Sequence, residues 1–205
     1  MKLYHSIGPN PRLVRMFLIE KGIELPAVDV DIIAGENRQS PFLAINPSGS
    51  TPVLMLDSGE ALAETTAICE YLEELHPQPP LIGSTPEARA RTRMWTRRID
   101  LAIVQPMTHG FRAAEGLPMF KERVRCLPQA ADDLKATARE GLAWLEARLG
   151  ERPFVAGDAL TLADIVLYSF VEFGALVGQG LDAGQARLSA WRERMASRDS
   201  AKATA

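Results

Sequence analysis

The alternation of apolar and polar residues changes character part-way along the chain. Up to about residue 76, short runs with a period of two alternate with stretches of helical period, whereas the chain after about Pro86 has helical period alone. This change predicts an α/β domain at 1–76 and an all-α bundle at 87–205. The intervening segment, residues 77–86, is rich in Pro and Gly and has no periodicity, as is typical of a linker.

The first domain is predicted to begin with a strand, a helix and a second strand. "KLYHS" and "PAVDVDI" have strand patterns, and "PRLVRMFLIEKG" places Leu13 and Phe17 on one face of a helix that Gly22 ends. Because such crossovers are right-handed, the two strands are expected to be parallel. A short helix at "PFLAIN", a hairpin from "PVLML" to "ALA", and a closing helix over residues 65–75 complete the domain.

The second domain is predicted to be a helical bundle. Its first long helix contains Pro106, which removes one backbone hydrogen bond and is expected to bend the helix. A second long helix is expected at about 119–149. An apolar central helix follows "TLAD", where Thr161 and Asp164 match a variant of the capping box. The polar tail "ASRDSAKATA" is expected to fray.

Composition argues against several classes of function. A formal net charge of -3 offers no basic footprint for nucleic acid or for an anionic membrane surface. No apolar run approaches the roughly 18 residues of a membrane helix, and the N-terminus has no signal core, so a cytoplasmic location is the default. Cys69 and Cys126 are far apart and form no CxxC, so neither a disulfide framework nor a metal site is expected.

The stretch "NPSGSTPVLMLDSGEALAETTAICEYL" carries the first chemical signal. Pro52 stands at the head of a strand, and a cis Thr51–Pro52 bond is expected to turn the N–H and C=O of Thr51 outward, where they can pair with an extended peptide. The helix that starts at "ETT" offers free amides to a carboxylate, and Glu64 offers a charge to an ammonium. Together these groups describe a ligand with an α-amino acid end and a peptide middle.

The sequence resembles the soluble, thioredoxin-like glutathione transferases over nearly its whole length. The resemblance rests on "LYHSIGPNPRLVRMFLIEKGI", "NPSGSTPVL", "ETTAICEYL" in place of the usual Glu-Ser pair, "HPQPPLIG" and "LTLADI". It implies a thioredoxin-like fold for the first domain, glutathione as co-substrate, a homodimer, and a role in detoxification. It also implies that Glu64 and Thr65 bind the γ-glutamyl end of glutathione, that Thr51 before Pro52 binds its cysteinyl backbone, and that Asn37 or Arg38 binds its glycine carboxylate.

Conjugation requires the glutathione thiolate, while a free thiol has a pKa of roughly 8.5. The family usually places a catalytic Tyr, Ser or Cys near the first helix, but here "SIGPNPR" has Gly8 where a Ser or Thr often stands. Two polar candidates remain, Ser6 and Asn10, whose simpler roles are a turn hydroxyl and a helix N-cap. "GPNPRLVR" is similar to an atypical fungal and bacterial class in which a water held by a His and a Ser of the helical domain stabilises the thiolate. This implies a role for His109, beside Thr108 rather than a Ser.

Three functions remain open. The first is a transferase that adds glutathione to small apolar electrophiles. The second is a glutathione-dependent peroxidase or disulfide reductase acting through Asn10. The third is a non-catalytic ligand carrier or scaffold, which the absent catalytic hydroxyl motivates. For the transferase, an apolar electrophile wall is expected from Met107, Phe111, Met119 and Phe120, and Asp100 is expected to reach the ligand amine across a dimer interface.

Overall fold

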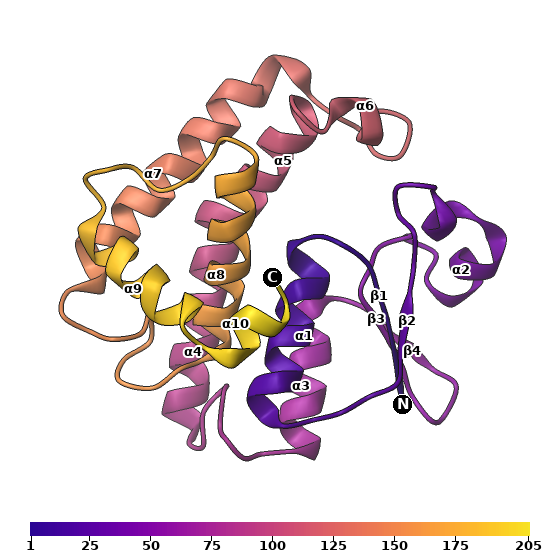
Figure 1. Ribbon diagram of the computed structural model, residues 1–205, viewed down its shortest axis with the longest axis horizontal. Coiled ribbons are helices and arrows are strands. Elements are labelled where there is room, and N and C mark those ends of the chain that lie inside the picture. The colour runs from indigo at the N-terminus through magenta and orange to yellow at the C-terminus, as the bar shows by residue number, and fades with distance from the viewer. The chain divides into compact units, whose positions relative to one another are not determined.

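The computed structural model describes all 205 residues, which group into two compact units (Figure 1). One unit comprises Met1–Leu81 together with Asp199–Ala205, and the other comprises Ile82–Arg198. The end of the chain therefore belongs with the N-terminal α/β unit. No helix combines the length and the apolar character needed to cross a membrane.

The first unit is built on a four-stranded sheet of order β2-β1-β3-β4, whose strands are β1 Lys2–His5, β2 Ala27–Asp29, β3 Val53–Met55 and β4 Ala61–Leu62. β1 pairs with β2 in parallel and with β3 in antiparallel orientation, and β3 and β4 form the hairpin. The predicted parallel pair and hairpin are confirmed. Because β1 and β2 are parallel, their carboxyl ends lie at the same edge of the sheet.

The helices of this unit are α1 Pro9–Lys21, the 3₁₀ turn η1 Glu36–Arg38, α2 Ser40–Ile45, α3 Thr65–Leu75 and α10 Asp199–Ala203. α1 buries Leu13 and Phe17 as the periodicity predicted, and it ends at Gly22 in the left-handed conformation. The closing helix α3 has the predicted bounds, and it packs against α1.

A buried ion pair joins α1, α3 and the chain that leaves the unit. Lys21 Nζ lies 2.6 Å from Glu73 Oε2 and donates to the carbonyl of Pro79 at 2.6 Å, and the backbone N–H of Leu81 donates to the same carboxylate. The side chains of Lys21 and Glu73 are 0% and 2% exposed. The pair therefore fixes three separate segments around one desolvated contact.

The expected fraying of the C-terminal tail is wrong, because α10 packs on α1. Arg12 donates to the carbonyl of Ala201, Arg15 donates to the carbonyl of Thr204, and Ser200 Oγ donates to Glu20 at 2.5 Å. The arginines meet the carbonyl end of the short helix, where a positive charge is favourable. The small side chains of the tail let it approach α1 closely, and Ala201 is buried.

The second unit is helical throughout, with a nearly wholly buried α8 near its centre. Its elements are α4 Pro86–Ile99, the π-helical turn η2 Asp100–Val104, α5 Gln105–Ala113, α6 Leu117–Phe120, the 3₁₀ turn η3 Pro128–Ala130, α7 Ala131–Leu149, α8 Leu162–Leu176 and α9 Ala186–Ala196. The predicted helix at 119–149 is wrong in its first part, because the chain turns after α6 and Pro128 starts a separate 3₁₀ turn.

The capping box at the start of α8 is confirmed, and its acid has a second role. Asp164 is fully buried and accepts from the N–H and hydroxyl of Thr161, from the N–H of Val155 at 2.8 Å and from the indole N–H of Trp191 at 3.0 Å. Burial raises the pKa of Asp164, and these donors act in the opposite direction. One carboxylate thus holds together α8, α9 and the loop before α8.

The helix that contains Pro106 departs from regular α-helical geometry just before the proline, and this segment packs closely on α7. The helix widens into the π-turn η2 just before Pro106, with the N–H of Gln105 donating to the carbonyl of Asp100. The carbonyl of Ala102 lies against Gly141 of α7, where an added Cβ would sit only 2.3 Å from that oxygen. Glycine is therefore required at position 141 for the close approach of the two segments.

We expect Gly141→Ala to lower the free energy of unfolding by about 1–3 kcal/mol, because overlap with a backbone oxygen outweighs the roughly 1 kcal/mol that alanine gains in a helix. Urea unfolding followed by circular dichroism measures the change. Gly184→Ala is the matched control, since its added Cβ meets open space. A Gly141→Ala protein as stable as the parent would contradict this packing.

We expect Lys21→Met to lower the free energy of unfolding by about 3–5 kcal/mol, because it leaves the Glu73 carboxylate buried without its cation. The double variant with Glu73→Leu should lose less than the sum of the two single variants, since the second change removes the charge that the first left unpaired. Chemical denaturation of the four proteins gives the coupling energy. Strict additivity would show that the ion pair does not couple α1 to α3.

Candidate functional site

The predicted peptide-binding edge lies where β3 begins. The Thr51–Pro52 bond is cis, as expected from the sequence. The pairing of Tyr4 with Val53 continues outward so that Ser6, just after β1, faces Thr51. Neither the backbone N–H nor the C=O of Thr51 hydrogen-bonds within the protein. Both groups therefore remain open to a ligand.

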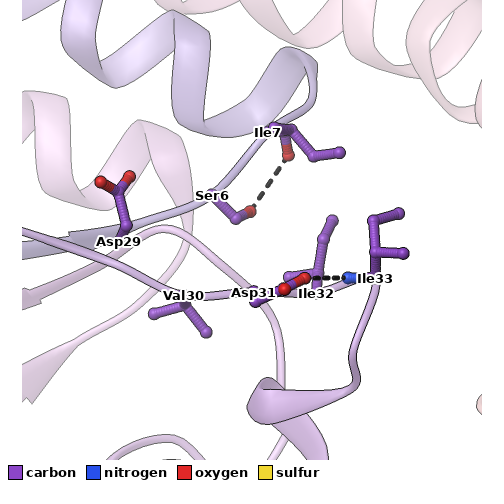
Figure 2. A pocket seen from close by; sticks show the side chains of 7 residues that line it. All are labelled: Ser6, Ile7, Asp29, Val30, Asp31, Ile32 and Ile33. Atoms are coloured by element: carbon purple, nitrogen blue, oxygen red, sulfur yellow. Dashed lines mark hydrogen bonds between the residues drawn. The ribbon is translucent and has the colours of Figure 1, made fainter.

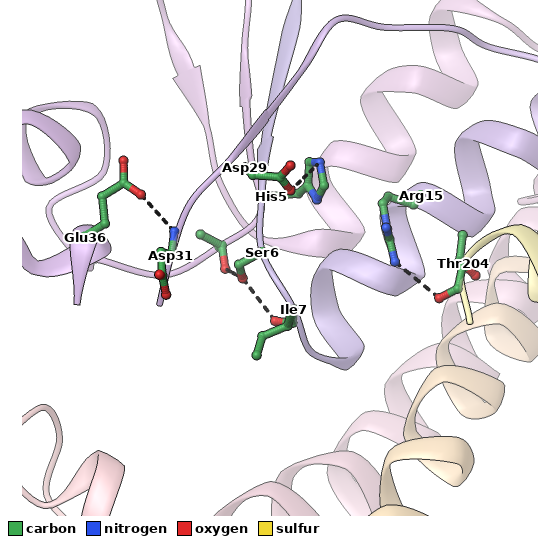
Figure 3. A network of polar contacts seen from close by, with 9 residues as sticks. His5, Ser6, Ile7, Arg15, Asp29, Asp31, Glu36 and Thr204 are labelled. Atoms are coloured by element: carbon green, nitrogen blue, oxygen red, sulfur yellow. Dashed lines mark hydrogen bonds and ion pairs between the residues drawn. The ribbon is translucent and has the colours of Figure 1, made fainter. Parts of the chain in front are cut away.

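Ser6 is tied to its protein neighbours. Its side chain is buried, and its hydroxyl lies 2.6 Å from the hydroxyl of Thr51 and donates to the carbonyl of Ile7 at 3.0 Å (Figure 3). A serine hydroxyl has only one proton to donate. The Ser6 hydroxyl therefore acts as a turn hydroxyl, the simpler of the two roles considered from the sequence. It also orients the side chain of Thr51.

Asn10 has free donors. Gly8, with φ of 111°, occupies the N-cap of α1, so Asn10 lies within the first turn and is not the N-cap. Pro9 and Pro11 carry no N–H, and the N–H of Arg12 already donates to Gly8, which leaves the amide of Asn10 as the open backbone donor of that turn. Its half-buried side chain makes no hydrogen bond within the protein.

The residue before α3 has an unusual backbone conformation. Glu64 is the only non-glycine residue with a positive φ, at 70°, and its exposed side chain does not cap the helix. The first hydrogen bond of α3 runs from Ile68 N–H to the carbonyl of Glu64, so the amides of residues 65–67 are free. Strained residues of this kind cluster at ligand-binding sites.

Asn37 and Arg38 lie in η1 and hold the loop that precedes Thr51. The side-chain nitrogen of Asn37 donates to the carbonyl of Gly49 at 2.6 Å, and Arg38 Nη1 donates to the carbonyl of Ser48 at 3.1 Å. The remaining amide oxygen of Asn37 is buried and can only accept, which does not suit a carboxylate. Arg38 Nε is buried without a partner, and Nη2 makes no hydrogen bond within the protein, so Nη2 is the donor that Arg38 can offer.

A pocket of about 220 Å³ opens beside the end of β1. Its lining comes from Ser6 and Ile7 after β1 and from the end of β2 onward, namely Asp29, Val30, Asp31, Ile32 and Ile33 (Figure 2). Sequence reasoning missed this pocket. The available signal was that both segments follow parallel strands, whose carboxyl ends border ligand sites in open α/β sheets.

The expected residues of the helical unit are distributed over several environments. His109 on α5 is exposed and has no partner, and the hydroxyl of the neighbouring Thr108 is buried and unpaired. Met107 is fully buried, so its predicted place in a ligand wall is wrong. Phe111 packs edge-to-face on Phe120.

Asp100 already has partners of its own within the helical unit. It pairs with Arg97 at 2.7 Å and accepts from Gln105 at 3.0 Å.

The cysteines provide no nucleophile in the α/β unit. Cys69 is fully buried, and burial raises the pKa of its thiol well above the usual value. Cys126 belongs to the helical unit, and both thiols are free. No cluster of three or more His, Cys, Asp or Glu side chains is arranged to hold a metal ion.

The strand order, the cis-proline edge and the open helix start define a thioredoxin-like α/β unit joined to a helical bundle. The family model of the glutathione S-transferase N-terminal domain matches residues 7–75, and that of the C-terminal domain matches residues 114–199. The chain therefore belongs to the glutathione S-transferase family, whose members are enzymes that use glutathione as co-substrate.

Individual relatives agree with this assignment. Glutathione S-transferase 2 of Saccharomyces cerevisiae is 35% identical over 202 residues, covering 95% of this chain and 84% of the relative. The maleylacetoacetate isomerase of Pseudomonas aeruginosa is 34% identical over 186 residues, covering 89% and 85%. The crystal structure of Gtt2 from S. cerevisiae superimposes with a TM-score of 0.92 at 33% identity and covers 100% of both chains. This similarity agrees with the atypical fungal and bacterial class.

Proposed function

We propose that this enzyme binds glutathione in an extended form along the open edge of the α/β unit. The N–H and C=O of Thr51, beside the cis Pro52, pair with the cysteinyl backbone. At the glycine end, Arg38 binds the carboxylate while Asn37 holds the loop. The observation that carries the proposal is the pair of unpaired backbone groups on Thr51.

The γ-glutamyl end binds at the start of α3. Its carboxylate meets the free amides that begin with Thr65, at the positive end of the helix dipole. Its ammonium meets the carboxylate of Glu64, which the positive φ directs away from capping the helix. The backbone strain at Glu64 thus serves ligand binding rather than helix formation.

The thiolate is stabilised by the first turn of α1. Lowering a thiol pKa by two units takes roughly 2.7 kcal/mol. A hydrogen bond to a charged group contributes about 1.5–3 kcal/mol, so the side-chain and backbone amides of Asn10 suffice. Ser6 acts by orienting Thr51. His109 acts through a water, as the resemblance implies for this class.

In the reaction, the thiolate sulfur attacks an electrophilic carbon and forms a sulfur–carbon bond. The leaving group departs with the electron pair of its broken bond, and the proton of the thiol has already passed to solvent. The enzyme supplies a larger fraction of thiolate and a fixed approach of the two reactants.

We further propose that the enzyme is a cytoplasmic homodimer that removes small apolar electrophiles. Two features support it: both cysteines are free, as is usual in reducing compartments, and Met94 and Leu101 are exposed apolar residues of one helical segment. Sedimentation equilibrium of the purified protein tests the dimer.

We expect Glu64→Gly to stabilise the fold slightly, by about 0.5–1 kcal/mol, because glycine adopts positive φ without strain. The same change should weaken glutathione binding about tenfold or more, since the ammonium loses its counter-charge. Glu64→Gln is the matched control, which should lose affinity without gaining stability. Thermal unfolding and isothermal titration calorimetry separate the two effects, and unchanged affinity in both variants would refute the assigned role of Glu64.

We expect glutathione bound to the parent enzyme to titrate clearly below the free thiol, as followed by the ultraviolet absorbance of the thiolate against pH. Asn10→Ala should raise that pKa by about one unit, the equivalent of roughly 1.4 kcal/mol. Ser6→Ala should leave the pKa nearly unchanged, and His109→Ala should give a smaller rise than Asn10→Ala. If bound glutathione titrates as it does in water, the carrier or scaffold function takes the place of the transferase.

A further inference from the structure

The pocket at the carboxyl ends of β1 and β2 is adjacent to the proposed position of the reacting sulfur. Ser6 lines the pocket and also contacts Thr51, the residue proposed to bind the cysteinyl backbone. Ile7 lines it as well and leads through Gly8 into the turn that contains Asn10. With glutathione bound as proposed, a molecule in this pocket lies beside its sulfur.

Aliphatic side chains form the walls of the pocket. Ile7 lies on one side, and Ile32 and Ile33 lie across from it (Figure 2). Ile7 and Ile33 are 66% and 63% exposed, which is unusual for isoleucine. Covering them with a ligand removes apolar surface from water and so favours an apolar occupant.

The charge at the rim is negative and held in place. Asp31 Oδ1 accepts from the backbone N–H groups of Ile33 and Ala34 at 2.9 Å each, and Glu36 accepts from the N–H of Asp31 at 2.8 Å. Neither Asp31 nor Glu36 forms an ion pair. The third acid is Asp29, whose Oδ1 lies 3.3 Å from His5 Nε2. Burial of His5 lowers the pKa of its imidazole and so favours the neutral form. No lysine or arginine side chain lines the pocket.

We propose that this pocket receives the electrophile and selects compact apolar electrophiles that are neutral or cationic over those that carry a carboxylate. The inference rests on the proposed transferase function and adds a substrate class to it. An anionic electrophile in the pocket faces the carboxylate of Asp31, which is held by the N–H groups of Ile33 and Ala34, and it must also approach a thiolate of the same sign. Asp31 is thus a specificity-determining residue.

The test compares 1-chloro-2,4-dinitrobenzene with 4-chloro-3,5-dinitrobenzoate, two chloroarenes that differ in overall charge. In both, sulfur replaces chloride, which leaves with the electron pair of the broken bond. At saturating glutathione, Asp31→Asn should raise kcat/KM for the carboxylate about three- to tenfold and change that for the neutral compound by less than about twofold. The amide keeps an acceptor for the turn at Ile33 and Ala34. Comparing each variant with the parent cancels the difference in intrinsic reactivity.

Glu60→Gln is the matched control. It removes the same charge from the same unit, but Glu60 lies in the β3–β4 turn, at the opposite end of β1 from the pocket. This change should alter kcat/KM for neither compound. Ile33→Ala supplies an independent readout, raising KM for the neutral compound about threefold or more with little change in kcat.

The failures are distinguishable. If the parent turns over both compounds but Asp31→Asn leaves their ratio unchanged, the specificity inference is overturned while the transferase function stands. If the parent conjugates neither compound and does not lower the pKa of bound glutathione, the proposed function is overturned and the inference falls with it.

Discussion

The buried contact between Lys21 and Glu73 sets the geometry on which the α/β unit depends. Lys21 is the last residue of α1 and Glu73 lies in the last turn of α3, so the two helices run side by side in the same direction. Their starts are then offset by only roughly 6 Å along the helix axes, about one turn. Two positive helix ends are therefore gathered at one end of the unit, and each has free amides. A tripeptide with a carboxylate at one end and a thiolate in the middle suits this arrangement of fixed partial charges.

The sheet adds the features that two helix ends alone do not provide. Its parallel pair brings the segments after β1 and β2 to one edge, which creates the pocket, and the antiparallel pairing of β3 brings Thr51 to the same edge beside Ser6. Backbone groups at Thr51 give affinity for an extended peptide without depending on its side chains. The aliphatic and acidic pocket proposed for the electrophile lies next to it. In the proposed site, Thr51 recognises glutathione and Asp31 selects the electrophile, while Ser6 borders both and links them.

The features that could be predicted from the sequence are those that depend on neighbouring residues in the chain. The hairpin, the crossover, the bounds of α3, the capping box at Thr161 and the cis bond at Pro52 all have short-range signals. The missed features depend on tertiary contacts. α10 is too short to persist alone and forms because Arg12 and Arg15 receive its carbonyl end. The pocket depends on the turn at Asp31, which fixes a loop with no periodicity. Around α1 the sequence offered Asn10 as a candidate N-cap, but Gly8 takes that position, and Pro9 then stands at the first helical position, which suits proline.

The absence of a catalytic hydroxyl is compatible with thiolate formation when the first turn of α1 is considered as a donor. Pro9 and Pro11 fix φ at two of its positions, so the turn is ordered before the ligand arrives and little reorganisation accompanies the appearance of negative charge. The two prolines also remove N–H groups that would otherwise require partners, which concentrates the donor capacity of the turn in Asn10. A side-chain amide is a weaker acid than a phenol, but it does not lose its proton at neutral pH, and in the proposed site Asn10 offers both its side-chain amide and its backbone amide to one sulfur. The energy needed, roughly 2.7 kcal/mol for two pKa units, lies within what two charge-assisted hydrogen bonds contribute.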